Sequence, residues 1–261
     1  WGYAATPLVH GGMLYTLAGG SGSAVVALDT KTGKELWRAL DAKDIGYAPP
    51  VLTSRDGKDE LLVWHSEALS GLDPATGKGR WSQSFTPSYG MSIMAPRVAP
   101  EGIFVGAIMK KSMLVKPGDG KAEIVWEGTP QNSLAPKNGT PVVVGEHFYG
   151  CDQDGDLRCV KTATGERLWS TLELMGNKKV GSGTFFMART PQQWVIFNDS
   201  GELILADLSP AGYKEAARAK ILSADTPSMG RTVVWSHPAF ANKCVFARND
   251  KELICVSLAA E

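Results

Sequence analysis

Histidine and acidic side chains supply most acid–base chemistry and metal binding in proteins, and in this sequence they are scattered. The histidines are His10, His65, His147 and His237, and none stands at the spacing of a metal motif. The run Asp152-Gln153-Asp154-Gly155-Asp156 resembles a calcium loop, but its glycine is misplaced and Ala163 stands where a bidentate Glu is needed. We interpret the run as an Asp-Gly hairpin turn. The sequence therefore predicts no catalytic, cofactor-binding or metal-binding residue.

Large aromatic and basic residues form a second group, better suited to binding than to catalysis. Side chains of these types are enriched at binding surfaces. They precede or open short apolar runs at Tyr3, Tyr47, Tyr89, Arg231, Trp235 and His237. We predict a binding surface from these six residues if the fold brings them together. The alternative is that they fill internal space or pack between structural units.

The four cysteines form two hairpin-like pairs. Cys151 and Cys159 flank one predicted turn, and Cys244 and Cys255 flank another. Cross-strand disulfides are therefore geometrically possible, whereas the alternative is free thiols packed as small hydrophobic side chains. The sequence leaves both alternatives open.

A repeated β-hairpin is the element that positions these residues. Its first copy ends at Trp37, after Asp29, which accepts backbone hydrogen bonds, and Gly33, which takes the left-handed conformation. Related copies place Trp37, Trp81, Trp126 and Trp169 at steps of 44, 45 and 43 residues. A period of about 40–50 residues with several short strands is typical of β-propeller blades. The predicted structural residues that dock the blades are Asp29, Gly33, Trp37, Asp73, Gly77, Trp81, Trp126, Gly165 and Trp169.

The sequence thus predicts an all-β fold, a β-propeller of four-stranded antiparallel blades in a single domain over residues 1–261. Six blades are expected, at about residues 1–40, 46–85, 93–127, 138–172, 182–221 and 233–261. Inner strands begin at the mouth of a propeller's central channel, which is where we expect the six binding residues. Because the last blade lacks an outer strand, we expect that the ring closes imperfectly or that residues upstream of Trp1 complete it. We interpret the chain as truncated at its N-terminus.

One segment has conflicting signals. Tyr213 to Lys220 is rich in strong helix formers. Its position in the repeat instead predicts the outer strand of the fifth blade, where charged residues are tolerated. We expect a strand.

The amino-acid composition limits the kinds of molecule that the protein is expected to bind. Lys and Arg total 27 and Asp and Glu total 27, so the net charge is zero and does not favour nucleic acid. No run of 18 apolar residues is present, so we expect no membrane-spanning helix. The oligomeric state is left open.

The pattern Ala-Leu-Asp-x-x-Thr-Gly-Lys-x-x-Trp at residues 27–37 resembles the repeat of quinoprotein dehydrogenases, which bind pyrroloquinoline quinone (PQQ), and of quinoprotein-like propellers. Full rings of this family commonly have eight blades, so the resemblance implies six blades of a larger ring. Residues 2–7, 69–78 and 201–206 resemble bacterial cell-envelope proteins similar to the lipoprotein B subunit of the outer-membrane β-barrel assembly machine. The dehydrogenases share a vicinal Cys-Cys pair and Ca²⁺ ligands that have no counterpart here. The resemblance therefore implies shared architecture.

The function expected from these features is a non-catalytic scaffold that binds a protein partner in the bacterial cell envelope. We expect it to be periplasmic, or membrane-anchored through a missing N-terminus, with no cofactor. One alternative is a PQQ-dependent oxidoreductase that uses the quinone with calcium. Another is a carbohydrate-binding or sensory module that uses the aromatic residues.

Overall fold

The computed structural model describes residues 3–109 and 111–259. Trp1 and Gly2, with which the first predicted blade begins, lie outside these ranges. Within them the regular structure is almost entirely β-strand, with two short 3-10 helices, η1 (Ser88–Gly90) and η2 (Glu173–Met175). The all-β prediction is therefore confirmed.

The chain divides into two compact units. The first comprises Trp1–Lys137 and Lys161–Glu166, and the second comprises Asn138–Val160 and Arg167–Glu261. Each unit is a series of sheets in which consecutive strands are antiparallel neighbours, except at β12. The single domain and the number of blades stay predictions.

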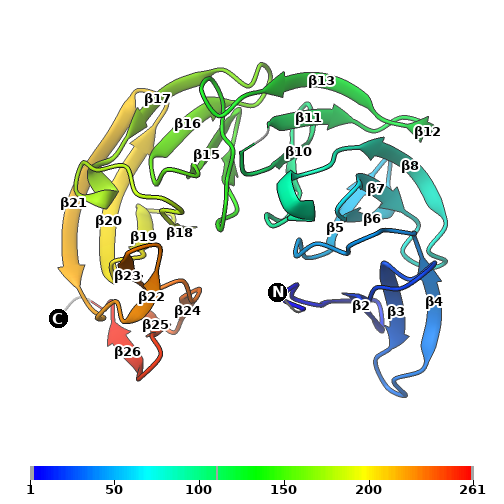
Figure 1. Cartoon of the computed structure of the whole chain (residues 1–261), viewed down its shortest axis with the longest axis horizontal. Coiled ribbons are helices and arrows are strands. Elements are labelled where there is room, and N and C mark those ends of the chain that lie inside the picture. The colour runs from blue at the N-terminus through cyan, green and yellow to red at the C-terminus, as the bar shows by residue number, and fades with distance from the viewer. Residues whose placement is uncertain (1–2, 110, 260–261) are drawn as a thin grey trace. The chain divides into compact units, whose positions relative to one another are not determined.

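Three four-stranded meanders make up the first unit (Figure 1). The first contains β1 (Leu8–His10), β2 (Met13–Leu17), β3 (Val25–Asp29) and β4 (Glu35–Ala39). The second contains β5 (Val51–Arg55), β6 (Lys58–Trp64), β7 (Ala68–Leu72) and β8 (Gly79–Ser84). The third contains β9 (Arg97–Ala99), β10 (Gly102–Gly106), β11 (Ser112–Lys116) and β13 (Glu123–Gly128). A fifth strand not predicted from the sequence, β12 (Gly120–Lys121), pairs in parallel with β8.

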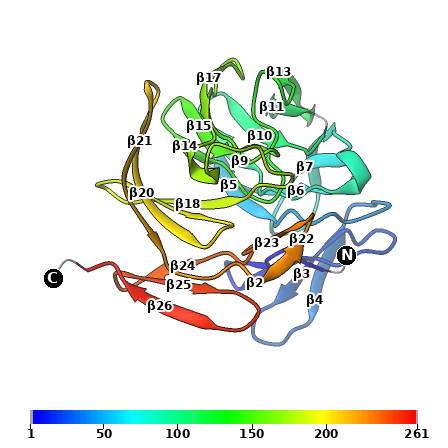
Figure 2. The same ribbon diagram turned by 60° about the vertical axis from the view of Figure 1, so that its left-hand side comes forward.

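The second unit repeats the pattern and then shortens (Figure 2). Its four-stranded sheets are β14 (Val142–Val144), β15 (His147–Cys151), β16 (Leu157–Lys161) and β17 (Arg167–Thr171), then β18 (Phe185–Arg189), β19 (Trp194–Asn198), β20 (Glu202–Ser209) and β21 (Gly212–Lys220). A three-stranded sheet contains β24 (Ala239–Ala241), β25 (Cys244–Arg248) and β26 (Leu253–Ser257). The hairpin of β22 (Thr226–Ser228) and β23 (Arg231–Val233) was not predicted.

Residues 213–220 form the strand that their position in the repeat predicts, and not the helix that their propensity favours. β21 covers residues 213–220 as a strand that pairs with β20 along its whole length. Two of its charged residues take part in ion pairs, because Arg218 bonds Glu202 at 2.9 Å and Glu215 at 2.7 Å. Hydrogen bonding to a neighbouring strand and this ion-pair network outweigh the helix propensity of the segment.

The repeated turn forms as its residues predict. Asp29 Oδ1 accepts the backbone N–H groups of Lys31 and Thr32 at 3.0 and 2.7 Å, and Gly33 has φ of 70°. In the second copy Asp73 Oδ1 accepts the N–H of Ala75 at 2.9 Å, and Gly77 has φ of 71°. The same local chemistry therefore joins the third and fourth strands of both sheets.

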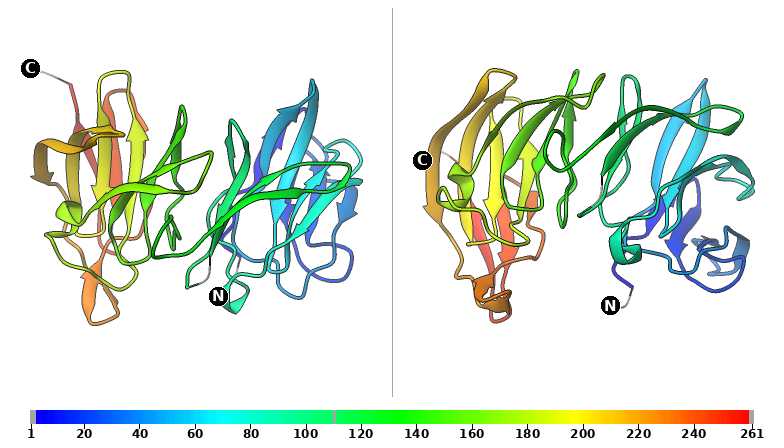
Figure 3. Two further views of the ribbon diagram at one scale, coloured as in Figure 1. Left: turned by 90° about the horizontal axis from the view of Figure 1, so that it is seen from above. Right: turned by 45° about the horizontal axis from the view of Figure 1, so that its top comes forward.

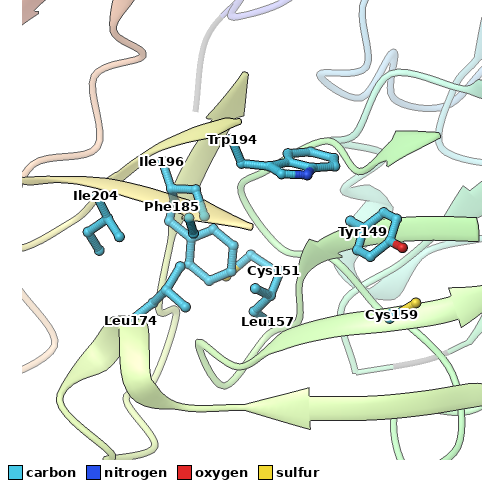
Figure 4. Packing of buried hydrophobic residues seen from close by; sticks show 10 residues of the cluster. Tyr149, Cys151, Leu157, Cys159, Leu174, Phe185, Trp194, Ile196 and Ile204 are labelled. Atoms are coloured by element: carbon cyan, nitrogen blue, oxygen red, sulfur yellow. The ribbon is translucent and has the colours of Figure 1, made fainter. Parts of the chain in front are cut away.

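Each unit has its own hydrophobic cores. In the first unit, Tyr15 and Val25 pack with Leu61, Val63 and Leu72 between the first two sheets. In the second unit, one core joins the sheet β14–β17 to the sheet β18–β21, and Figure 4 shows Tyr149, Phe185, Trp194 and Ile196 converging in it. Another core joins the sheet β18–β21 to β25 and β26. Neighbouring sheets within each unit therefore pack on one another through these cores, and Figure 3 shows the strands of the sheets from two further directions.

Candidate binding site

Three of the repeat tryptophans make the same kind of contact. Trp37 Nε1 donates to the carbonyl oxygen of Pro74 at 3.0 Å, and Trp126 Nε1 donates to that of Thr162 at 2.7 Å. Trp169 Nε1 donates to the carbonyl oxygen of Ser209 at 3.0 Å. Each acceptor lies in, or directly before, the turn between the third and fourth strands of a later sheet. These tryptophans therefore join neighbouring hairpins through hydrogen bonds, which is a structural role.

Glycine makes room for two of these indole rings. A Cβ atom at Gly77 would lie 2.5 Å from Cε3 of Trp37, and one at Gly165 would lie 2.6 Å from Cε3 of Trp126. The same turn position in the first copy, Gly33, has no neighbour within 4 Å. At Gly77 and Gly165, glycine therefore both adopts the left-handed turn conformation and leaves space for an indole ring.

Trp81 departs from this arrangement. Its side chain is 2% exposed and lies over Gly71 of the adjacent strand, and its Nε1 has no hydrogen-bond partner among the described residues. The hairpin of the third sheet lacks the Thr-Gly sequence of the other copies, and its turn instead contributes β12, whose Gly120 pairs with Trp81 itself. Where the other tryptophans meet a carbonyl oxygen near a hairpin turn, Trp81 therefore has the strand β12 beside it.

The structure brings together three of the six predicted binding residues. Tyr3, Tyr47 and Tyr89 line a cavity of about 410 Å³ in the first unit. We call it the tyrosine pocket; its remaining wall comes from Gly19, Gly20, Gly90 and residues 42–46. Glycines expose backbone there, so a ligand can approach the main chain closely between aromatic side chains.

Hydrogen bonds fix the segment that forms one side of the tyrosine pocket. The backbone N–H of Tyr47 donates to Ser92 O at 2.7 Å, and that of Asp44 donates to Ser66 Oγ at 3.2 Å. Ser92 is buried and its hydroxyl donates to Trp64 O at 2.9 Å. Gly46 packs so tightly on Ser92 that no side chain fits there. This side of the pocket is therefore preorganised.

Two of the tyrosines extend into solvent at the rim. Tyr3 is 78% exposed and Tyr89 is 81% exposed. Tyr89 lies in η1 with φ of 58°, a left-handed conformation that costs a non-glycine residue energy. The aromatic ring is thus held outward at some conformational cost, as is common at binding sites.

The other three predicted residues lie in the second unit and do not share a site there. Arg231 pairs with the fully buried Asp199 at 2.6 Å and borders a shallow cavity of about 390 Å³ formed by residues 227–232. His237 contacts Phe186 with ring centroids 3.8 Å apart and the ring planes tilted by 41°, and burial lowers the pKa of its imidazole. The Trp235 indole nitrogen is buried without a hydrogen-bond partner among the described residues.

A larger polar cavity was missed from the sequence. It measures about 570 Å³ in the first unit, and Arg55, Lys58, Lys78 and Arg80 contribute to its lining together with Asp73. Arg80 bonds Asp73 at 2.8 Å, and this hydrogen bond is the main cause that lowers the pKa of the carboxyl group. Arg55 bonds the buried Glu60 at 3.2 Å. Two of its four basic side chains are therefore already neutralised by acidic neighbours, which makes the tyrosine pocket the better candidate.

The acidic run at residues 152–156 is a turn, as interpreted from the sequence. The backbone N–H of Gly155 donates to Asp152 O at 3.0 Å. Arg158, itself buried, bonds Asp152 at 3.0 Å and Asp156 at 2.6 Å. The carboxylates are thus partnered by a guanidinium group.

The residues present do not match a quinone and calcium site. The four cysteines are not adjacent in the sequence, so no vicinal Cys-Cys pair can form. Among residues 3–109 and 111–259, no three His, Cys, Asp or Glu side chains gather in a way that could hold a metal ion.

Comparison with known proteins gives a family and a fold. The model of the family described as outer membrane protein assembly factor BamB matches residues 2–171 and 69–261. The crystal structure of BamB from Moraxella catarrhalis superposes with a TM-score of 0.66 at 15% identity, covering 97% of this chain and 69% of that chain. Quinohemoprotein alcohol dehydrogenase from Comamonas testosteroni superposes with a TM-score of 0.60 at 15% identity, covering 94% and 51%. The fold is therefore a β-propeller of the PQQ-repeat type.

The chain belongs to the family of the outer membrane protein assembly factor BamB. It is also 35% identical over 122 residues to quinohemoprotein alcohol dehydrogenase ADH IIB from Pseudomonas putida. That match covers 40% of this chain and only 16% of the length of the dehydrogenase. The described part of the chain contains no helix that is long and apolar enough to cross a membrane.

Proposed function

We propose that this chain is a non-catalytic scaffold of the bacterial cell envelope, which binds an extended segment of a protein partner at the tyrosine pocket. The observation that carries the proposal is the pair of exposed tyrosines, Tyr3 and Tyr89, held at the rim of a preorganised cavity. Aromatic side chains in such positions are common anchors of protein interfaces. Membership of the BamB family supports the assignment to an assembly factor.

The polarity of the pocket favours a peptide over a purely apolar ligand. Lys43 and Asp44 stand beside the tyrosines, and the glycine-rich wall offers backbone groups for hydrogen bonds. An extended segment presents alternating side chains together with its own backbone donors and acceptors. It can therefore place aromatic side chains on the tyrosines and polar ones on the charged pair.

A binding experiment with three chemically distinct probes tests the proposal. The probes are synthetic peptides that copy alternating apolar–polar strands of outer-membrane β-barrels, a glycan panel, and PQQ with Ca²⁺. We expect saturable peptide binding that Tyr89→Ala weakens by about tenfold or more, the effect of losing an interface anchor. Val98→Ala, at an exposed apolar residue of β9 outside the pocket, should leave the affinity unchanged.

The other probes distinguish the alternatives. Saturable binding of PQQ with Ca²⁺ would replace the scaffold with a quinone-dependent oxidoreductase. Binding of a glycan that depends on Tyr89 would make the pocket a carbohydrate site. Peptide binding that is insensitive to both Tyr3→Ala and Tyr89→Ala would move the partner surface elsewhere.

A further inference from the structure

The last hairpin of the described chain brings two thiols to one face of a sheet. β25 and β26 are antiparallel, with Cys244 opposite Ser257 and Cys255 opposite Phe246. Side chains alternate between the two faces of a strand, so both cysteines project from the same face. They are diagonal neighbours, two positions apart along the ladder, with the pair Val245–Val256 between them.

The opposite face of the hairpin is the buried one. Val245 and Ala247 are buried in a hydrophobic core, and Ile254 and Val256 pack against it. The alternate positions, including Cys244 and Cys255, therefore face away from that core. Cys244 is half-buried and Cys255 is exposed, so dissolved reagents can reach the pair through Cys255.

We propose that Cys244 and Cys255 are the site of a disulfide that joins β25 to β26. Diagonal residues of an antiparallel pair have Cα atoms about 7–8 Å apart, whereas a disulfide needs about 4.4–6.8 Å. An approach of about 1 Å is therefore required. Among residues 3–109 and 111–259, β26 is the edge of its three-stranded sheet and has β25 as its one neighbouring strand, so it can make this adjustment.

The pKa of the Cys255 thiol reflects its surroundings in the reduced protein. Desolvation is the first cause that raises this pKa, and the neighbouring Cys244 thiol is the second. The thiolate is the reactive form, so oxidation should be faster at about pH 9 than at about pH 7. A bacterial cell envelope, which the proposed function implies, is a compartment in which disulfides persist; the chemistry of the pair does not depend on that assignment.

The reaction needs an oxidised low-molecular-weight disulfide such as glutathione disulfide. The Cys255 thiolate attacks one sulfur of the reagent, forms a mixed disulfide and releases one thiol. The Cys244 thiolate then attacks the Cys255 sulfur and releases the second thiol. Two protein thiols lose two electrons and two protons, and the reagent is reduced to two thiols.

The second cysteine pair provides an internal control. Cys151 is buried, its thiol hydrogen-bonds Asp152 O and Gly183 O at 3.4 and 3.3 Å, and burial raises its pKa well above the usual value. Cys159 lies in the same core, and burial raises its pKa as well. Both should stay reduced while the protein is folded.

The test uses the full chain, first reduced and then incubated with glutathione disulfide. We expect two of the four thiols to disappear, the mass to fall by two hydrogen atoms, and peptide mapping to find Cys244 joined to Cys255. Cys159→Ser should not prevent the bridge. Cys244→Ser should instead leave glutathione attached to Cys255, because the resolving thiol is gone.

A second measurement reports on the strand itself. Amide hydrogen exchange in β26 should be slower in the oxidised protein than in the reduced protein, and Cys255→Ser should abolish the difference. Four free thiols after incubation, a lasting glutathione adduct on Cys255 of the unmutated protein, or a bridge between Cys151 and Cys159 would overturn the proposal. Each of these outcomes is independent of peptide binding at the tyrosine pocket.

Discussion

His65 is a buried imidazole whose protonation state is tied to the fold. Its Nδ1 accepts the backbone N–H of Glu67 at 3.2 Å, so this nitrogen carries no proton. Burial is the main cause that lowers the pKa of the side chain below its usual value. A neutral His65 therefore holds the turn between β6 and β7, close to the Ser66 that supports the tyrosine pocket.

The lowered pKa makes stability depend on pH in a definite direction. Between the folded pKa and the unfolded value of about 6.5, the unfolded chain binds more protons than the folded chain. The free energy of unfolding should therefore fall as the pH drops from about 7 through this window. His65→Gln keeps an acceptor for the Glu67 N–H but does not titrate, so its stability should fall less.

Denaturant unfolding at a series of pH values checks this prediction. His237→Gln is the matched variant in the second unit, since burial also lowers the pKa of His237. Each variant should remove part of the pH dependence. Curves that run parallel for the unmutated protein and both variants would show that neither histidine is coupled to unfolding.

At the scale of the hairpin, replacing a turn glycine by alanine has two destabilising effects, backbone strain and a steric clash, and Gly33 and Gly77 allow them to be measured separately. Both glycines have φ near +70°, so alanine at either position costs about 1–2 kcal/mol for the left-handed conformation. Only at Gly77 does the new methyl group also meet an indole, that of Trp37. Gly77→Ala should therefore lower the free energy of unfolding more than Gly33→Ala does, by about 1–3 kcal/mol of overpacking.

Urea unfolding of the two variants measures the difference directly. Gly165→Ala should behave like Gly77→Ala, because Trp126 lies over it in the same way. Equal losses at Gly33 and Gly77 would mean that the tryptophan moves aside without cost. The comparison would then refute a structural role for this contact.

The sequence predicts the hairpins well where the chemistry of the turn is local. Asp29 and Gly33 form the expected turn because both act on residues within the same hairpin. The environment of Trp81 was beyond such reasoning, since it depends on β12, which comes from the connection between β11 and β13 and joins the sheet of Trp81. The hairpin β22–β23 was also missed, because its three-residue strands are too short to show a period.

At the scale of the whole molecule, the repeat explains why three of the six predicted residues line one cavity. Tyr3, Tyr47 and Tyr89 are 44 and 42 residues apart, so successive repeats bring them to equivalent places. The tyrosine pocket follows from that period. Lys43 and Asp44 could not be predicted, because they lie in a loop whose path is fixed by the hydrogen bonds of Ser66 and Ser92.

The balance of charge predicts how copies of the protein interact in solution. Because the net charge is zero at pH 7, electrostatic repulsion between molecules is minimal there. Exposed apolar side chains, among them Leu253 at 71% and Val9 at 62%, then favour association. The second virial coefficient from light scattering should therefore be lower at about pH 7 than at about pH 9, where the protein is negative.

Introducing a single charge at an exposed edge strand tests whether Leu253 is responsible for the self-association at pH 7. Leu253 lies at the start of β26, the edge strand of its sheet, and edge strands are commonly protected by lysine. The control is Thr30→Lys, at an exposed polar residue in a turn. Leu253→Lys should raise the second virial coefficient at pH 7 more than this control does. Equal effects of the two substitutions would assign the attraction to net charge alone, and the edge strand would then have no special part in self-association.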